Sequence, residues 1–361
     1  MPSGSEARIV SAEGSAPVVP AEARHRRLVA GMLRWESGLA LALVAVIVFG
    51  ASSSGQFFTS YNMFNLGLTT GEIAIITLPM TLIVISGEID LSVASTLGMS
   101  SAVLGYLWLH GWPMSAIFAV VLVVGAAAGA LNGFLVTRIG LPSLAVTIGT
   151  LAVYRGIADI VLGPTSVSTF PTKYTNIGVK ALPHTDLSFS VCLFIVLAIV
   201  FGVVLHATPV GRSIFAMGAN QEAAMFSGIR VKRVKMGLFV LSGVICAMSG
   251  ALWTFRLSTA VENNGVGLEL DVVAIVLLAG VSIFGGKGTI LGVVLAVLVF
   301  AGLQNALLLT NFNQEATGIV TGSLLLVSVL VPNSRSFATR LRARFTPRRP
   351  GATFEPAGSE L

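Results

Sequence analysis

Two short segments of this sequence carry side chains whose types and spacing could do chemistry. The first, "SGEIDLS" (86–92), places Glu88 and Asp90 two residues apart, and paired carboxylates can transfer protons or hold a metal ion. Residues i and i+2 do not share a helix face, and the sequence nearby offers no third ligand and no nucleophile. We therefore expect a polar turn in which Asp90 caps the next helix and satisfies its first amides.

The second segment, "FGGKGT" (284–289), resembles a phosphate-binding loop. Such a loop needs Gly, four residues, Gly, Lys and then Ser or Thr, directly after a strand. Counted from Gly280, the Lys position holds Gly286, and Lys287 is followed by Gly288. We interpret the segment as a tight turn between two apolar runs, and the sequence predicts no catalytic residue, metal site or cofactor.

Composition places the chain in a membrane. Hydrophobic residues make up 54% of the 361 residues, charged residues only 11%, and the mean hydropathy is +0.88. A soluble domain devotes about a quarter of its residues to charge, so a soluble module is excluded. The net charge of +6 fits basic residues gathered at cytoplasmic helix ends, so we expect contact with lipid and not with nucleic acid.

The fold class that follows is an all-α polytopic membrane protein, because a helix crosses the hydrocarbon layer with about 20 apolar residues. We expect about ten transmembrane helices, near 37–53, 62–85, 91–109, 113–137, 141–163, 187–207, 235–256, 269–284, 289–310 and 315–332. Gly125, Gly129 and Gly133 recur every four residues, which predicts a close contact between two helices.

Orientation follows from the basic residues. With ten spans and both termini cytoplasmic, most of the 22 Lys and Arg residues lie on the inner side, and only Lys173 and Lys180 fall clearly in an outer loop. We therefore expect a multi-pass protein of the cell (plasma or inner) membrane. Its parts would be a disordered tail (1–34), a transmembrane domain (35–332) and a basic tail (333–361), both tails cytoplasmic.

A polar segment at 211–235 separates two long apolar runs of the sequence. Asn220 is a good N-cap, Glu222 suits the positive end of the helix dipole, and Gly228 is well placed as the stop. Between them "QEAAMFS" makes about two helical turns, too few to persist alone in water. The segment must therefore rest on something, and the alternatives are a partner protein and the membrane surface.

Four segments resemble, in the same order, the permease subunits of ABC sugar importers of the ribose, xylose and rhamnose type. They are "VISGEIDLSVAS" (84–95), "LNGFLVTRIGLPSLAVTIGTLAVYRGIA" (131–158), "GRSIFAMGANQEAAMFSGIRVKRVK" (211–235) and "LELDVVAIVLLAGVSIFGGKGTILG" (268–292). Rhamnose-transporter permeases look most similar, and autoinducer-2 importer permeases come next. The resemblance implies a short cytoplasmic coupling helix that docks on a separate ATPase subunit. The docking residues would be Gly218, Asn220, Glu222, Ala223, Ala224, Ser227 and Gly228.

The resemblance also implies two further partners. An extracytoplasmic sugar-binding protein would dock on outer loops near 164–186 and 257–268, and a second permease subunit, identical or homologous, would complete the pathway. The sequence leaves open which sugar is carried and whether the pair is a homodimer or a heterodimer.

Polar residues within spans invite functional hypotheses, because a charge at mid-membrane costs about 2.5–3.5 kcal/mol on insertion scales. Arg155 and Asp159, four residues apart, are expected to neutralise each other. Residues that could line a path for a polyhydroxylated solute are Glu72, Asn132, Gln304 and Asn305.

Two other functions compete with the importer. An ion-coupled secondary transporter would need buried titratable groups on its path, for which Glu72, Asp159 and Asp271 are candidates, but it does not explain the capped helix at 220–228. A membrane enzyme would need an acid–base pair, a metal cluster or an activated nucleophile, and the sequence shows no such constellation.

Overall fold

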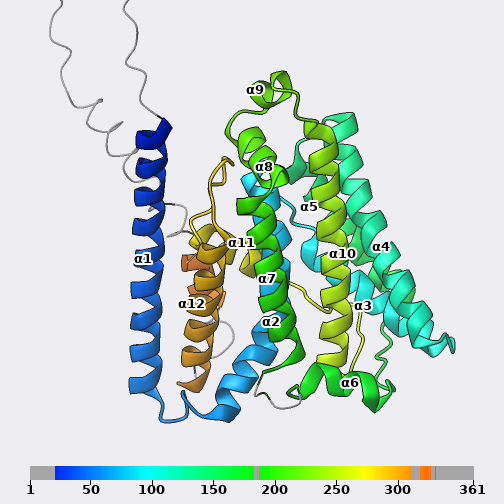
Figure 1. Cartoon of the computed structure of the whole chain (residues 1–361). Helices are drawn as coiled ribbons and strands as arrows, with labels where there is room; N and C mark the ends of the chain where they lie inside the picture. The colour runs from blue at the N-terminus through cyan, green and yellow to red at the C-terminus, as the bar shows by residue number, and fades with distance from the viewer. Residues whose placement is uncertain are drawn as a thin grey trace, which may run out of the picture.

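The computed structural model of the chain describes residues 21–182, 185, 187–310, 312, 318–324, 326 and 330. Within them the protein is helical, and the strand-like pairing recorded there consists of two isolated bridges. The helices, shown in Figure 1, are α1 (Ala21–Ser53), α2 (Ser60–Ile85), α3 (Val93–Leu109), α4 (Met114–Phe134), the π-helical turn η1 (Leu135–Ile139), α5 (Ser143–Leu162), α6 (Thr172–Val179), α7 (Phe189–Ala207), α8 (Pro209–Ala219), α9 (Gln221–Phe226), α10 (Val231–Leu257), α11 (Leu268–Leu278) and α12 (Ile290–Leu309).

Seven helices in the described part of the chain are long and apolar enough to cross a membrane: Trp35–Ser53 of α1, α2, α4 continued by η1, α5, α7, α10 and α12. Ten spans are therefore not confirmed. The run expected at 91–109 is the 17-residue helix α3, and the run at 269–284 forms only the 11 residues of α11. Half of the span expected at 315–332 lies outside the described residues.

The early end of α11 has a local cause. Gly280, Gly285 and Gly286 have φ of +80°, +81° and +73°, a left-handed conformation that glycine adopts readily and that cannot continue a right-handed helix. Hydropathy counts these glycines as neutral, so it extended the predicted span past the point where the backbone turns.

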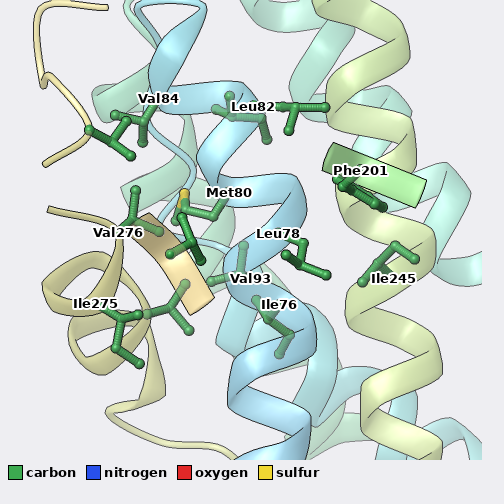
Figure 2. Close-up of a cluster of buried hydrophobic side chains, with 14 of the residues drawn as sticks. Ile76, Leu78, Met80, Leu82, Val84, Val93, Phe201, Ile245, Ile275 and Val276 are labelled. Carbon is green, nitrogen blue, oxygen red and sulfur yellow. The ribbon is translucent and has the colours of Figure 1, made fainter. Parts of the chain in front are cut away.

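Helix α2 is the centre of the bundle. It packs against α7, α10, α11 and α12, and Ile75, Ile76, Leu78 and Met80 on it are fully buried. Figure 2 shows its side chains meeting Phe201 of α7, Ile245 of α10 and Ile275 of α11. Because residues 71–85 of α2 are buried, the surrounding helices shield the polar groups on this stretch from lipid.

Helices α4 and α10 approach backbone to backbone, as the glycine spacing predicted. A Cβ atom at Gly129 would lie 2.1 Å from the carbonyl oxygen of Phe239, and one at Gly125 would lie 2.4 Å from that of Gly243. A side chain at either position would separate the two helices, so the predicted small-residue contact is confirmed and its partner is α10.

The bundle has two distinct ends (Figure 1). Helices α8 and α9 lie at one, here called the α9 end, and α6 lies with the last turn of α10 at the other, the α6 end. Helix α1 begins at Ala21, within the stretch expected to be a tail, and packs along α12. The boundaries expected near 34 and 333 stay predictions, and residues 1–20 and 331–361 lie outside the described residues.

Candidate functional site

Helix α9 is capped at both ends, as its sequence predicted. The Asn220 side chain accepts a hydrogen bond from the Ala223 amide at 3.0 Å. At the other end Gly228 has φ of +84°, and the Ile229 amide donates a hydrogen bond to the Ala224 carbonyl at 3.1 Å. These caps hold six helical residues in place, a length that does not persist alone in water.

The seven residues expected to dock on a partner divide into two groups. Asn220, Glu222, Ala223, Ser227 and Gly228 are exposed. Ala224 is buried against the bundle and Gly218 packs against the end of α2. These two residues therefore hold α9 against the bundle and do not face a partner.

The structure adds Phe226 to the outward face of α9. Its side chain is 94% exposed, an unusual position for a large aromatic residue because its hydration is unfavourable. Met225 beside it is also exposed, though less so, and the sequence could not tell which of the two is the more exposed, since only the fold fixes how α9 is rotated.

Lys235 connects α9 to the loop between α2 and α3 (86–92). Its ammonium lies 2.5 Å from a carboxylate oxygen of Glu88 and 2.6 Å from the amide oxygen of Gln221, the first residue of α9. The Lys235 and Glu88 side chains are only 7% and 15% exposed. A displacement of α9 therefore acts on the 86–92 loop through one buried cation.

A second connection joins α8, the end of α2 and the 284–289 loop through their backbones. The Gly286 amide donates to the Ile85 carbonyl at 2.8 Å. A Cβ atom at Gly218 would lie 1.8 Å from that same oxygen. The three segments can meet this closely only because position 218 has no side chain.

The 284–289 loop is the tight turn that the sequence predicted. The Ser282 amide donates to the Lys287 carbonyl at 3.1 Å, and the Gly285 amide donates to the Ser282 carbonyl at 2.9 Å. No strand precedes it, since α11 and a short connection do, and Lys287 is exposed. The motif therefore serves the contact with α8 and does not have the architecture of a phosphate-binding loop.

Asp90 lies just before α3 but is not its cap, contrary to the expectation from the sequence. It accepts hydrogen bonds from the Ser92 amide at 3.0 Å and the Ser92 hydroxyl at 2.6 Å, and Ser242 of α10 donates to its other oxygen at 3.2 Å. Ser92, not Asp90, is the N-cap residue, and it makes no side-chain capping bond of its own. Burial raises the pKa of the Asp90 carboxyl, and the bonds from Ser92 and Ser242 oppose that rise.

Asn132 extends this network into α4 and α5. Its amide donates to the Ser92 hydroxyl at 2.8 Å, and its oxygen accepts from the Tyr154 hydroxyl at 3.3 Å. It is 1% exposed, so the structure places this path candidate in a buried network of side chains.

Glu72 forms the second buried ion pair. Its carboxylate lies 3.1 Å from Arg256 Nε on α10 and accepts a bond from the Ser190 hydroxyl of α7 at 3.0 Å. The side chain is fully buried, and Arg256 also lies 4.4 Å from the ring centre of Trp253. The pair joins three helices near the α6 end.

The expected pairing of Arg155 with Asp159 is absent from the described part of the chain, where the salt bridges are those of Lys235 and Arg256. Arg155 instead donates to the carbonyls of Glu262 and Asn264 at 3.2 and 2.8 Å, and Asp159 is exposed. Sequence spacing permitted the pairing, but the 258–267 loop brings carbonyl groups to the guanidinium.

The remaining path candidates lie on α12. Asn305 exchanges two hydrogen bonds with Asn62 of α2, at 2.8 and 2.9 Å. Gln304, its neighbour, is half-buried and lines a cavity together with Asp271. The fold therefore separates these adjacent amides into a helix contact and a cavity wall.

Long apolar helices joined by buried polar links, with one short capped helix exposed at an end, define a polytopic membrane protein. The family model described as "Branched-chain amino acid transport system / permease component" matches residues 62–329. The chain belongs to this family and is a permease component of an ABC transporter, a membrane subunit without a catalytic role of its own.

Curated relatives cover most of the chain. It is 31% identical over 306 residues to the autoinducer 2 import system permease protein LsrD of Yersinia enterocolitica, with 82% of this chain and 91% of the relative aligned. It is 31% identical over 296 residues to the ribose import permease protein RbsC of Haemophilus influenzae, with 81% and 91% aligned. LsrD of Escherichia coli K12 is 30% identical over 309 residues, with 82% and 91% aligned. No solved structure is significantly similar.

Proposed function

We propose that the chain is the permease subunit of an ATP-driven importer and that α9 is the place where a separate ATPase subunit docks. The single observation that carries the proposal is a helix held rigid by caps at both ends that presents a 94% exposed Phe226. A thousandfold accumulation of solute costs about 4 kcal/mol, and a permease component must receive that free energy from a partner. Helix α9 would transmit this free energy to the bundle through the contacts of Lys235 and Gly218.

The α9 end would face the cytoplasm. Arg138, Arg212, Arg230, Lys232 and Arg233 are exposed on the segments at this end, whereas the α6 end carries Lys173 and Lys180. Basic residues favour the cytoplasmic side of a membrane. The proposal keeps both termini cytoplasmic, and an extracytoplasmic binding protein would dock at the α6 end.

The proposed substrate class is a monosaccharide or a similarly small polyhydroxylated solute. One relative is a ribose permease and others are autoinducer 2 permeases. Rhamnose, favoured by the resemblance of the sequence motifs, is the specific proposal. A second permease subunit, identical or homologous, would complete the pathway.

The test is affinity purification of the tagged chain from native membranes in mild detergent, with mass spectrometry of the proteins that accompany it. We expect a stoichiometric ATPase subunit, lost in Glu222→Arg and retained in Lys173→Glu, a charge reversal at the α6 end. A chain that purifies alone, and that still concentrates sugar in energised vesicles without ATP, would replace this proposal with an ion-coupled transporter.

A further inference from the structure

Most of the polar residues that could line a solute path already bind other residues. Glu72 pairs with Arg256, Asn132 bonds to Ser92, and Asn305 bonds to Asn62. Gln304 is different, because its amide makes no hydrogen bond within the part of the chain that the structure describes. A half-buried amide that no described residue binds still has its donors and acceptors to offer.

Gln304 opens onto a cavity of about 670 Å³. This volume falls within the range of about 300–1,000 Å³ that is usual for small-molecule sites. The cavity lies between the last turns of α10, the 258–267 loop, α11, α12 and residues 318–321. It is therefore at the opposite end of α10 from α9, where a solute delivered at the α6 end would arrive first.

The polar groups in its wall suit a neutral polyol. Asn263 and Gln304 supply amides, Thr321 a hydroxyl and Asp271 a carboxylate, while Trp253 supplies an aromatic surface. Hydroxyl groups both donate and accept, so they can bond to all of these groups.

The same wall disfavours an anionic solute. No Lys or Arg is among the described residues that line the cavity, so a solute carboxylate would find no cation. It would instead meet the carboxylate of Asp271, and two like charges in a partly buried site repel each other. Neutral hydroxyl groups face neither penalty.

One wall of the cavity is held rigid from behind. The 258–267 loop contributes Asn263 to the cavity, while the next residue, Asn264, donates to the Ser101 hydroxyl of α3 at 2.8 Å. Arg155 binds the Glu262 and Asn264 carbonyls from α5. A loop fixed on its rear side keeps its front groups oriented, which lowers the entropic cost of binding.

From these observations we propose that this cavity is the site at which the permease holds its solute, and that it accepts a neutral polyhydroxylated molecule and not an anion. The inference rests on the proposed importer function and deepens it. It assigns solute contact to Gln304, Asp271, Asn263 and Trp253, and it leaves Glu72, Asn132 and Asn305 as structural residues.

The experiment places a cysteine in the cavity wall and asks which solutes shield it. In a background of Cys192→Ser and Cys246→Ala, which removes both native cysteines, Gln304→Cys is labelled with a small thiol reagent in the intact membrane complex. D-ribose, L-rhamnose and L-leucine are the three probes. Leu298→Cys, at an exposed position on the same helix, is the control. Uptake of the same solutes is measured in parallel with Gln304→Leu and Leu298→Ala.

We expect at least one sugar to slow labelling of Gln304→Cys several-fold, with no protection by leucine and no effect on Leu298→Cys. Uptake of that sugar should fall at least tenfold in Gln304→Leu and stay unchanged in Leu298→Ala. Protection by leucine alone would overturn the solute class. Sugar uptake that persists in Gln304→Leu, with no protection by any sugar, would overturn the site and leave the importer function standing. A wild-type complex that takes up neither sugar would overturn the substrate proposal itself, and this inference with it.

Discussion

The Lys235 ammonium lies 2.5 Å from the Glu88 carboxylate, although the two residues stand 147 positions apart in the sequence. The same ammonium also binds Gln221 at the start of α9. One buried cation thus holds the exposed helix and the loop after the central helix α2 in a fixed relation. Any movement imposed on α9 must either carry the 86–92 loop with it or break this contact.

The first prediction concerns that ion pair. Lys235→Met should lower stability by about 3–5 kcal/mol, because it leaves the Glu88 carboxylate buried without its cation. Adding Glu88→Gln should recover most of the loss, since the double variant buries no uncompensated charge. Thermal unfolding in detergent measures both, and Lys232→Met, an exposed neighbour, should stay within about 0.5 kcal/mol of the parent. Strictly additive losses in the double variant would show that the pair is not coupled.

The second prediction separates docking from folding. Phe226→Ser should weaken capture of the ATPase subunit at least tenfold while leaving the unfolding temperature unchanged, because the 94% exposed ring makes little contact within the chain. Val210→Ser, at a half-exposed apolar position on α8, is the matched control and should retain the ATPase. Pull-down at several ATPase concentrations measures both variants. Full capture by Phe226→Ser would contradict docking through this face.

The third prediction concerns the closest backbone contact at the α9 end. Gly218→Ala should destabilise the protein by about 1–3 kcal/mol, because its Cβ would lie 1.8 Å from the Ile85 carbonyl oxygen. Gly237→Ala in α10 has no atom within 4 Å of its Cβ, so it should be neutral or up to about 1 kcal/mol stabilising. Unfolding temperatures of the two variants, measured side by side, decide the point. Equal behaviour would mean that α8 moves away from α2 without cost.

The fourth prediction concerns the turn at 284–289. Lys287→Ala should leave ATP hydrolysis by the whole complex largely intact, because the side chain is exposed and the loop lacks the architecture of a phosphate site. Gly286→Ala, one residue earlier, should reduce solute-stimulated hydrolysis. Its φ of +73° disfavours a side chain, and its Cβ would lie 2.9 Å from the Ala219 amide. A complex inactivated by Lys287→Ala and unaffected by Gly286→Ala would reverse our interpretation of the loop.

Features that depend on neighbouring residues were predictable from the sequence. Asn220 caps α9 because its side chain reaches an amide three residues along, and Gly228 stops it because glycine adopts a positive φ. The glycine spacing at 125–133 predicted a close helix contact. The segment 284–289 does not match a phosphate-binding loop, and it was predicted to be a turn. Each of these follows from local stereochemistry, which needs no knowledge of the rest of the fold.

The number of spans and the partners of the buried charges were not predictable in the same way. Hydropathy reports how apolar a segment is, but it cannot say that α11 ends at Leu278. Spacing on one helix suggested that Asp159 is the partner of Arg155, while the structure supplies carbonyls from a loop more than a hundred residues away.

By itself, the sequence determined that this protein lies in a membrane, that it carries a capped helix at 220–228, and that one close helix contact runs along glycines. Only the tertiary structure decided that Lys235 meets Glu88, that Arg256 meets Glu72, and that Gln304 faces a cavity while Asn305 does not. The physical reason is that a buried charge or amide binds whatever group the packing of distant helices brings within about 3 Å. That choice is made by the fold as a whole.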